Sequence, residues 1–128
     1  VLTPFVFLAA CASGGNGPSA PTPAVNEEFT LAPGQTATVN GASVRLTFER
    51  VSEDSRCPVD VTCIWAGEAR VALDFVGLMS WEGTLSAGAG ASVIVAGWIV
   101  TVTDLTPAPR SDRPIAPGDY QVRMVVTR

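Results

Sequence analysis

Hydrophobic and polar residues alternate along much of the chain after residue 27, with the period of two that is typical of strands with one buried face. The clearest examples are residues 43–51, 68–76 and 120–126. No segment of this part has the period of an amphipathic helix, so the pattern predicts an all-β fold. The positions expected to face the core in these three strands are Val44, Leu46, Phe48, Ala69, Val71, Leu73, Phe75, Tyr120, Val122, Met124 and Val126.

Turn signals separate the predicted strands. Asn40-Gly41 is the strongest short hairpin signal, Pro33-Gly34 is typical of a type II turn, and Ala96-Gly97 divides two apolar segments. Further short strands are expected at 27–31, 36–39, 80–86, 92–95 and 98–105. Seven or eight short strands with such turns predict a single antiparallel β-sandwich, immunoglobulin-like or similar, over residues 27–128.

The first ten residues form an uncharged apolar run, as long as the hydrophobic part of a signal peptide and too short to span a bilayer. The run ends in Leu8-Ala9-Ala10-Cys11, which resembles the bacterial lipobox. In such leaders the cysteine receives a diacylglyceryl group and becomes the first residue after cleavage. Residues 1–10 are therefore expected to be a truncated signal peptide, with Cys11 as the lipid attachment site and membrane anchor.

Residues 11–26 read as a tether between this anchor and the folded body. The segment from Ala12 to Asn26 contains three Gly, three Pro, two Ser and two Asn with little apolar bulk, a composition typical of flexible linkers. A buried structural thiol is the alternative interpretation of Cys11, but this composition disfavours it. Ala12 in place of Asp resembles outer-membrane sorting in Gram-negative lipoproteins, so the expected location is the envelope, at an outer membrane facing the periplasm or the surface.

Composition narrows the chemistry that the chain can perform. It has no His, and all eight basic residues are Arg, so the commonest general base and any lysine-based mechanism are excluded. The net charge of −4 and pI of about 4.6 disfavour nucleic acid as a partner. The sequence indicates no cofactor, and an enzyme would have to work with carboxylates alone. We expect a protein that is not an enzyme.

One loop carries a resemblance to a known family. Asp54-Ser55-Arg56-Cys57-Pro58 is followed by a second cysteine at 63 and by Trp65-Ala66-Gly67. This arrangement resembles a family of small secreted or lipid-anchored bacterial proteins of uncharacterised activity, and the similarity is dense over residues 54–73. The resemblance implies an exported protein of this size and no particular activity.

Cys57 and Cys63 are the best candidates for a disulfide in an exported domain. In the chain-entropy model, closing so short a loop stabilises the fold by only about 2–2.5 kcal/mol, so the bond is expected to shape the loop more than to hold the domain. Cys11 leaves the cysteine count odd, which lipidation explains. A metal site at these two cysteines is disfavoured, because two thiolates without His lack the usual ligand set and spacing.

The loop Ser52–Gly67 is the expected working surface, with Asp54, Arg56, Trp65 and Glu68 as candidate binding residues. Trp65 is either an aromatic anchor for a partner or a buried residue packed against the disulfide, and its place just before a strand favours the buried interpretation. Asp54 and Arg56 either face a partner or pair with one another and with loop amides. The second arrangement is the commoner one for such residues.

The function expected from these observations is binding of an envelope protein partner or a structural role, without catalysis. A protease-inhibitor-like domain is one form of this hypothesis, because a braced loop suits insertion into a cleft. The alternative is a small-molecule or glycan-binding module in which exposed tryptophans form a stacking platform. Against that alternative, Trp81 and Trp98 are expected in the core or at its rim.

Overall fold

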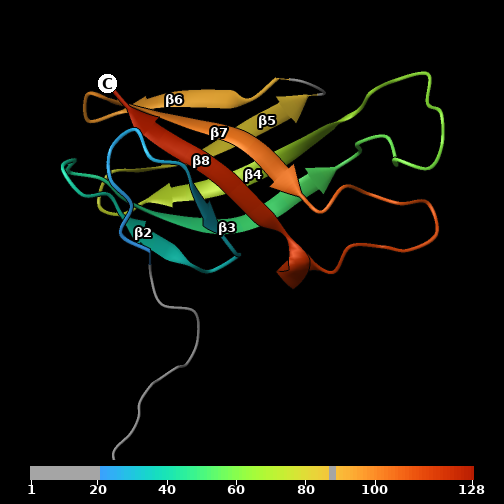
Figure 1. Ribbon diagram of the computed structural model, residues 1–128, viewed down its shortest axis with the longest axis horizontal. Helices are drawn as coiled ribbons and strands as arrows, with labels where there is room; N and C mark the ends of the chain where they lie inside the picture. The colour runs from blue at the N-terminus through green and yellow to red at the C-terminus, as the bar shows by residue number, and fades with distance from the viewer. Residues whose placement is uncertain (1–20, 87–88) are drawn as a thin grey trace, which may run out of the picture.

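The chain forms two antiparallel four-stranded sheets packed face to face (Figure 1). The computed structural model describes residues 21–86 and 89–128. A 3₁₀ turn, η2 (Pro117–Asp119), precedes the last strand. The strands are β1 (Phe29–Leu31), β2 (Thr36–Thr38), β3 (Arg45–Asp54), β4 (Glu68–Phe75), β5 (Met79–Ser86), β6 (Ala91–Val95), β7 (Trp98–Thr106) and β8 (Gln121–Thr127). The predicted all-β sandwich is confirmed.

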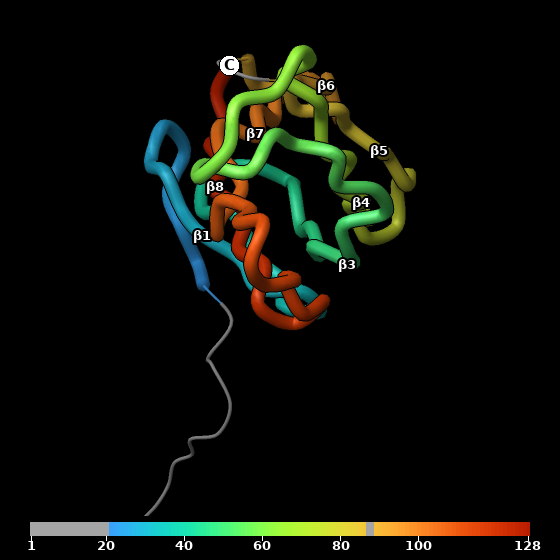
Figure 2. The backbone as a smooth tube through the Cα atoms, turned by 90° about the vertical axis from the view of Figure 1, so that its right-hand side faces the viewer, coloured from blue at the N-terminus to red at the C-terminus, as the bar shows by residue number. Residues whose placement is uncertain are grey.

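Strands β2 to β5 and strands β6 to β8 lie side by side in chain order, and β1 pairs with β8. One sheet has the order β2-β3-β4-β5 and the other β1-β8-β7-β6, so the chain changes sheets between β1 and β2 and again between β5 and β6. Figure 2, seen from one end of the sandwich, shows this succession around the core. The predicted sandwich, immunoglobulin-like or similar, is thus confirmed as a sandwich, and its mostly consecutive connections, a meander, differ from the Greek-key connections of immunoglobulin domains.

Local turn chemistry explains the meander. Gly41 and Gly97 have φ of 89° and 85°, and Ala96 also has a positive φ of 52°. Such residues make tight connections that place successive strands side by side. The turns predicted at Asn40-Gly41 and Ala96-Gly97 join β2 to β3 and β6 to β7 as expected.

The core is filled by the alternating apolar residues. All the residues that the pattern assigned to the core in the three clearest strands are buried, and Trp98 is buried with them while Trp81 packs half-buried against the cluster. The Trp81 ring covers Gly83, where a Cβ would lie only 2.3 Å from the ring. In the part of the chain that the structure describes, no polar or charged residue falls in the buried class. Hydrophobic burial therefore accounts for the sandwich itself.

Residues 21–26 belong to the folded body, contrary to the boundary predicted after Asn26. The amide of Thr38 donates to the carbonyl of Pro21 (3.2 Å), that of Asn40 to Pro23 (2.7 Å), and that of Asn26 to Val126 (2.8 Å). Pro23 is buried. Residues 1–20, which contain the predicted leader, Cys11 and the rest of the predicted tether, lie outside the described residues. Within residues 21–86 and 89–128, no helix has the length and apolar character needed to cross a bilayer.

The loops divide between the two ends of the sandwich (Figure 1). One end carries the β3–β4 connection, residues 55–67, and the β7–β8 loop, residues 107–120. The other end carries the tight turns of the hairpins, the C-terminus and the segment that begins at Pro21. The described chain thus enters the domain at the end opposite the β3–β4 loop.

Candidate functional site

The β3–β4 connection, which we call the disulfide loop (residues 55–67), is closed by the predicted bond between Cys57 and Cys63. Their Cα atoms are 5.9 Å apart and χ3 is 88°, so the expected disulfide is confirmed. Between the disulfide and the strands, the amide of Cys57 donates to the carbonyl of Ala66 (3.0 Å), and the amide of Ser55 donates to the carbonyl of Glu68 (2.7 Å). These bonds continue the β3–β4 ladder into the base of the loop.

Gly67 allows the base of the loop to close. Its φ is 72°, and a Cβ at this position would lie 1.8 Å from the carbonyl oxygen of Ser55. A side chain here meets both a disfavoured backbone conformation and a direct collision with backbone. The glycine is therefore required by the close approach of the two loop stems.

Asp54 and Arg56 pair within the domain. The Arg56 guanidinium donates to both carboxylate oxygens of Asp54, from Nε and from Nη2, at 2.7 Å each. Side-chain exposure is 18% for Arg56 and 12% for Asp54. Asp54 is paired across the sheet with buried Ala69, which places its side chain on the core face. Internal pairing, one of the two arrangements expected from the sequence, is the one observed.

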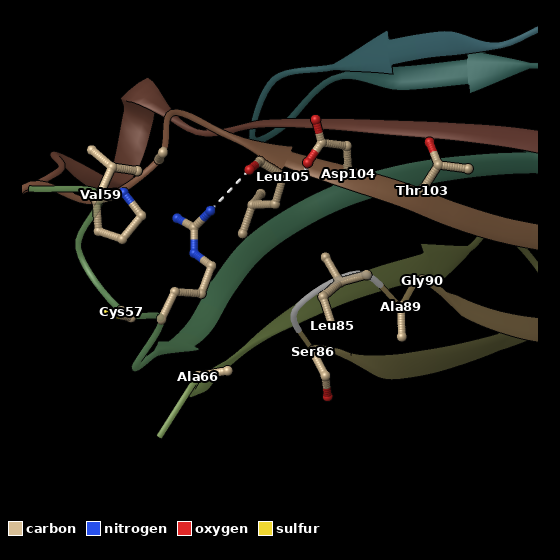
Figure 3. Close-up of a pocket in the computed structure, with 13 residues that line it drawn as sticks. Cys57, Val59, Ala66, Leu85, Ser86, Ala89, Gly90, Thr103, Asp104 and Leu105 are labelled. Atoms are coloured by element: carbon tan, nitrogen blue, oxygen red, sulfur yellow. Dashed lines mark hydrogen bonds between the residues drawn. The ribbon is translucent and has the colours of Figure 1, made fainter. Parts of the chain in front are cut away.

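Two distant segments complete what we call the Asp54–Arg56–Tyr120 network. Arg56 also donates to the carbonyls of Leu105 (2.9 Å) and Pro107 (3.0 Å), and the first of these bonds is drawn in Figure 3. The Tyr120 hydroxyl donates to Oδ2 of Asp54 at 2.8 Å. All three guanidinium nitrogens are occupied, so Arg56 has little capacity left to recognise a ligand. These bonds favour a structural role for Arg56, and its part in partner binding stays a prediction.

The network shifts the pKa values of its members. Burial would raise the pKa of Asp54, but hydrogen bonds from Arg56 and Tyr120 hold it below the ordinary 3.8. Burial and the bond to Asp54 raise the pKa of Tyr120 from 10.0 to about 12. The hydrogen bond to Asp54 raises the pKa of Arg56. At neutral pH the network thus holds one carboxylate, one guanidinium and a neutral phenol.

A second attachment ties the tip of the disulfide loop to the β7–β8 loop. The amide of Val59 donates to the carbonyl of Pro109 at 2.9 Å. The carboxylate of Asp60 accepts from the hydroxyl of Ser111 (2.6 Å) and from its amide (2.9 Å). The hydrogen bonds from Ser111 lower the pKa of Asp60. The two loops are therefore joined at both the base and the tip.

Trp65 is exposed, so its predicted burial against the disulfide is wrong. Its exposed fraction is 80%, and that of the adjacent Ile64 is 94%. Cys57, Val59 and Ala66 of the loop line a pocket together with Arg56. Val59 and Val61 add further exposed apolar surface on the same loop.

A pocket of about 480 Å³ opens beside the disulfide loop, between the ends of the two sheets (Figure 3). Leu85 and Leu105 are buried residues in its lining, and Ala66 and Ala89 add small apolar walls. Its volume is in the range of small-ligand sites. The Arg56 charge at its wall is already paired with Asp54, but Ser86, Thr103 and Asp104 also line the pocket, so its surface is mixed, with apolar and polar parts.

Glu68, the remaining predicted site residue, stands apart from the network. At the base of the loop, the Ser55 hydroxyl donates to the backbone carbonyl of Glu68 (3.0 Å). Its carboxylate lies 3.9 Å from Nε of Arg70, which also approaches Glu53 (3.7 Å). These pairs are exposed and contribute little stability. Within the described residues, no three His, Cys, Asp or Glu side chains gather as metal ligands would.

Sequence reasoning missed the partners that the β7–β8 loop supplies. Tyr120 was predicted only as a core residue, and Ser111 was not singled out. They meet Asp54 and Asp60 across 66 and 51 residues, and local patterns do not report such separations. The one available signal was the phenol of an inward-facing tyrosine, which needs a polar partner when buried. Comparison with models of known families, with curated proteins and with solved structures finds no match to this chain.

We expect Gly67→Ala to destabilise the domain severely, because its Cβ would collide with the Ser55 carbonyl as well as require a positive φ. Gly77→Ala is the matched control, since Gly77 has a φ of 78° with open space around it and should cost only about 1–2 kcal/mol. Urea unfolding of the two variants measures the difference. Equal losses of stability would contradict the steric argument.

We expect the Asp54–Arg56–Tyr120 network to make the stability of the domain depend on pH both in acid and in alkali. The lowered pKa of Asp54 contributes stability above pH 3.8 that is lost as the pH falls through its folded pKa. The raised pKa of Tyr120 contributes stability below pH 10.0 that is lost as the pH rises toward about 12. Asp54→Asn should cost about 2–4 kcal/mol at neutral pH, because it leaves the guanidinium unpaired, and the cost should shrink in acid.

Because the chain has a single tyrosine, the titration of Tyr120 in alkali can be measured directly. Tyrosinate absorbance should titrate near pH 12 in the native protein and at a lower pH in Asp54→Asn, since burial still raises the pKa of Tyr120 but the carboxylate that accepts from the phenol is gone. Circular dichroism checks that both proteins remain folded. An unchanged titration in Asp54→Asn would refute the assignment of the shift to this carboxylate.

Proposed function

We propose that this protein is a lipid-anchored component of the bacterial cell envelope that binds a protein partner through its disulfide loop and performs no catalysis. The observation that carries the proposal is the exposure of Ile64 and Trp65, 94% and 80%, side by side on one loop. Adjacent large apolar side chains in water are a feature of interaction surfaces, and tryptophan is among the residues that dominate binding energy.

The bracing of the loop supports the same function. The disulfide, the bond from Val59 to Pro109 and the contacts of Asp60 with Ser111 hold the loop at several points. A surface that is already ordered loses less conformational entropy when it binds, so more of the contact energy appears as affinity. This argues for recognition by a rigid loop.

The proposed location rests on Leu8-Ala9-Ala10-Cys11 and on the family resemblance of the disulfide loop. Attachment through Cys11 is consistent with the domain's geometry, since the described chain enters at the end opposite the loop. The loop would then face away from the membrane, toward a partner in the periplasm or at the surface. Sorting to the outer membrane rests on Ala12 alone.

A protease-inhibitor-like domain is one specific form of this proposal. An exposed, disulfide-closed loop has the shape needed to enter a protease cleft. Assays against a panel of purified serine and cysteine proteases test it directly, with the Trp65→Ala variant as the matched control. If native protein slows none of the panel, this form fails while partner binding of another kind stands.

The pocket supports a second candidate, binding of a small ligand that has an apolar part. Its volume of about 480 Å³ and its lining by Leu85, Leu105 and Ala66 suit such a molecule. Glycan stacking on several tryptophans is less favoured, because Trp98 is buried and Trp81 is half-buried under the core cluster. Trp65 is the one tryptophan of the three that is largely exposed.

We expect Trp65→Ala to abolish recovery of the partner in a cross-linking pull-down from intact cells, using the full chain with a C-terminal tag. Removing an exposed anchor should weaken binding tenfold or more, which corresponds to about 1.4 kcal/mol or more. Leu78→Ala is the matched control, because Leu78 is also exposed (54%) but lies in the β4–β5 turn at the other end.

Cys11→Ala in the same experiment tests the location separately. It should release the protein from the membrane fraction and leave the loop itself unchanged. Equal recovery of one partner with native protein and Trp65→Ala would overturn the proposed role of the loop. Membrane association that persists in Cys11→Ala would instead overturn the lipid anchor.

A further inference from the structure

Exposed large apolar side chains gather at two places in the part of the chain that the structure describes. Four of them belong to the disulfide loop, and three belong to the β4–β5 turn (residues 76–79), at the opposite end of the sandwich. The three are Val76, Leu78 and Met79, of which Leu78 is the most exposed at 54%. The proposed function uses the apolar residues of the disulfide loop and gives no role to those of the β4–β5 turn.

Backbone hydrogen bonds fix the shape of this turn. The amide of Leu78 donates to the carbonyl of Phe75 (2.8 Å), and that of Val76 to the carbonyl of Arg45 at the start of β3 (2.9 Å). Gly77 takes the positive φ of 78° that the turn needs, and a Cβ built on it would meet open space. The apolar side chains are therefore carried by an ordered tip that reaches into the solvent.

A row of backbone contacts links the turn to the point where the described chain enters the domain. The amide of Thr38 donates to the carbonyl of Pro21, Thr38 pairs with Arg45, and the carbonyl of Arg45 accepts from Val76. Three steps between neighbouring segments, at about 4.8 Å each, put the turn about 15 Å from Pro21. Because the row runs across the strands, both features lie at the same end of the sandwich (Figure 1).

We propose that the β4–β5 turn rests on the surface of the membrane to which Cys11 is attached, so that the domain stands on this end. The inference rests on the lipid anchor of the proposed function. Ten residue steps separate Cys11 from Pro21, and a chain spans at most about 3.3–3.6 Å per residue, so the anchor keeps Pro21 within about 36 Å of the lipid surface. Such a short connection gives the turn a high effective concentration near lipid, where weak apolar contacts suffice for docking.

The length of this connection selects the turn over the other exposed apolar surface. The ten residues of β3 span about 30 Å at the rise of a strand and run from this end of the sandwich to the base of the disulfide loop. Bringing Ile64 and Trp65 to the membrane would therefore use almost the full reach from Cys11 along the side of the domain. The β4–β5 turn needs only a small part of that reach.

The charges beside the turn indicate which kind of lipid contact to expect. Arg45 is exposed at the start of β3, and Asp74 near the end of β4 accepts a hydrogen bond from the Ser80 hydroxyl (3.2 Å). Because one basic and one acidic residue flank the turn, neither sign dominates. Docking should therefore come from apolar contact at the headgroup boundary, with little preference for anionic lipid.

A fluorescent label in the turn of the lipidated protein tests the docking. In Leu78→Cys the new thiol is the one that reacts, because Cys57 and Cys63 are bonded to each other and Cys11 carries the lipid under the proposed anchor. The protein is labelled with nitrobenzoxadiazole and placed in phosphatidylcholine vesicles that contain a spin-labelled phosphatidylcholine. Quenching should be about threefold or more stronger than for the same label at Ile64→Cys, the matched exposed position on the disulfide loop. Adding phosphatidylglycerol should leave this ratio unchanged.

A charge in the turn provides the second measurement. Met79→Glu, added to the Leu78→Cys chain, should reduce quenching about threefold or more, since a carboxylate resists leaving water, whereas Met79→Leu should leave quenching unchanged. Circular dichroism checks the fold of each variant. Equal quenching at the two labelled positions, or quenching that survives Met79→Glu, overturns the docking. Blue-shifted emission without quenching by the spin-labelled lipid also overturns it, because protein would then cover the turn.

The mass of the peptide that contains Cys11 separates this proposal from the one on which it rests. Diacylglyceryl-modified Cys11 together with an unquenched label at Leu78→Cys leaves the anchor standing and refutes the docking. Unmodified Cys11 refutes the anchor and the docking together. The role of the disulfide loop is judged separately, by the pull-down with Trp65→Ala.

Discussion

The ion pair between Asp54 and Arg56 is the interaction on which the arrangement of the loops depends. Asp54 ends β3, Arg56 begins the disulfide loop, and their partners Leu105, Pro107 and Tyr120 belong to the other sheet and its loop. The disulfide closes only six positions of sequence, whereas these hydrogen bonds join segments 49 to 66 residues apart. The covalent bond therefore shapes the loop, and the hydrogen bonds of the network fix its position on the sandwich.

The network also limits which side chains of the loop are available to contact another molecule. Arg56 gives all its nitrogen atoms to Asp54 and to two carbonyls, and Asp60 is bonded to Ser111. The charged residues of the loop thus build the structure, and the outward surface is left to Ile64, Trp65 and the valines. Affinity at such a surface comes from apolar contact, with little part for charge attraction.

The strands, the core positions and the disulfide could be predicted from the sequence, because each is set by local chemistry. Period-two alternation placed Val71 and Val122 in the core, and Asn40-Gly41 placed a hairpin. The burial predicted for Trp65 is wrong, because a position just before a strand does not determine on which side of the loop a side chain lies. The inner side of the loop is lined by Arg56 and the β7–β8 loop, and the contact between Arg56 and Leu105 spans 49 residues that local patterns do not connect.

A meander of this kind gives its two ends different structures. Tight hairpin turns and the segment at Pro21 occupy one end, and the two long loops occupy the other. Long loops in small sandwiches lose much entropy on ordering, so they remain fixed only where specific bonds compensate. Here one partly buried ion pair, one phenol and one serine supply those bonds. The exposed Ile64 and Trp65 are therefore carried by a loop that is fixed at its base and its tip, where, under the proposed function, an apolar surface would lose little conformational entropy on binding.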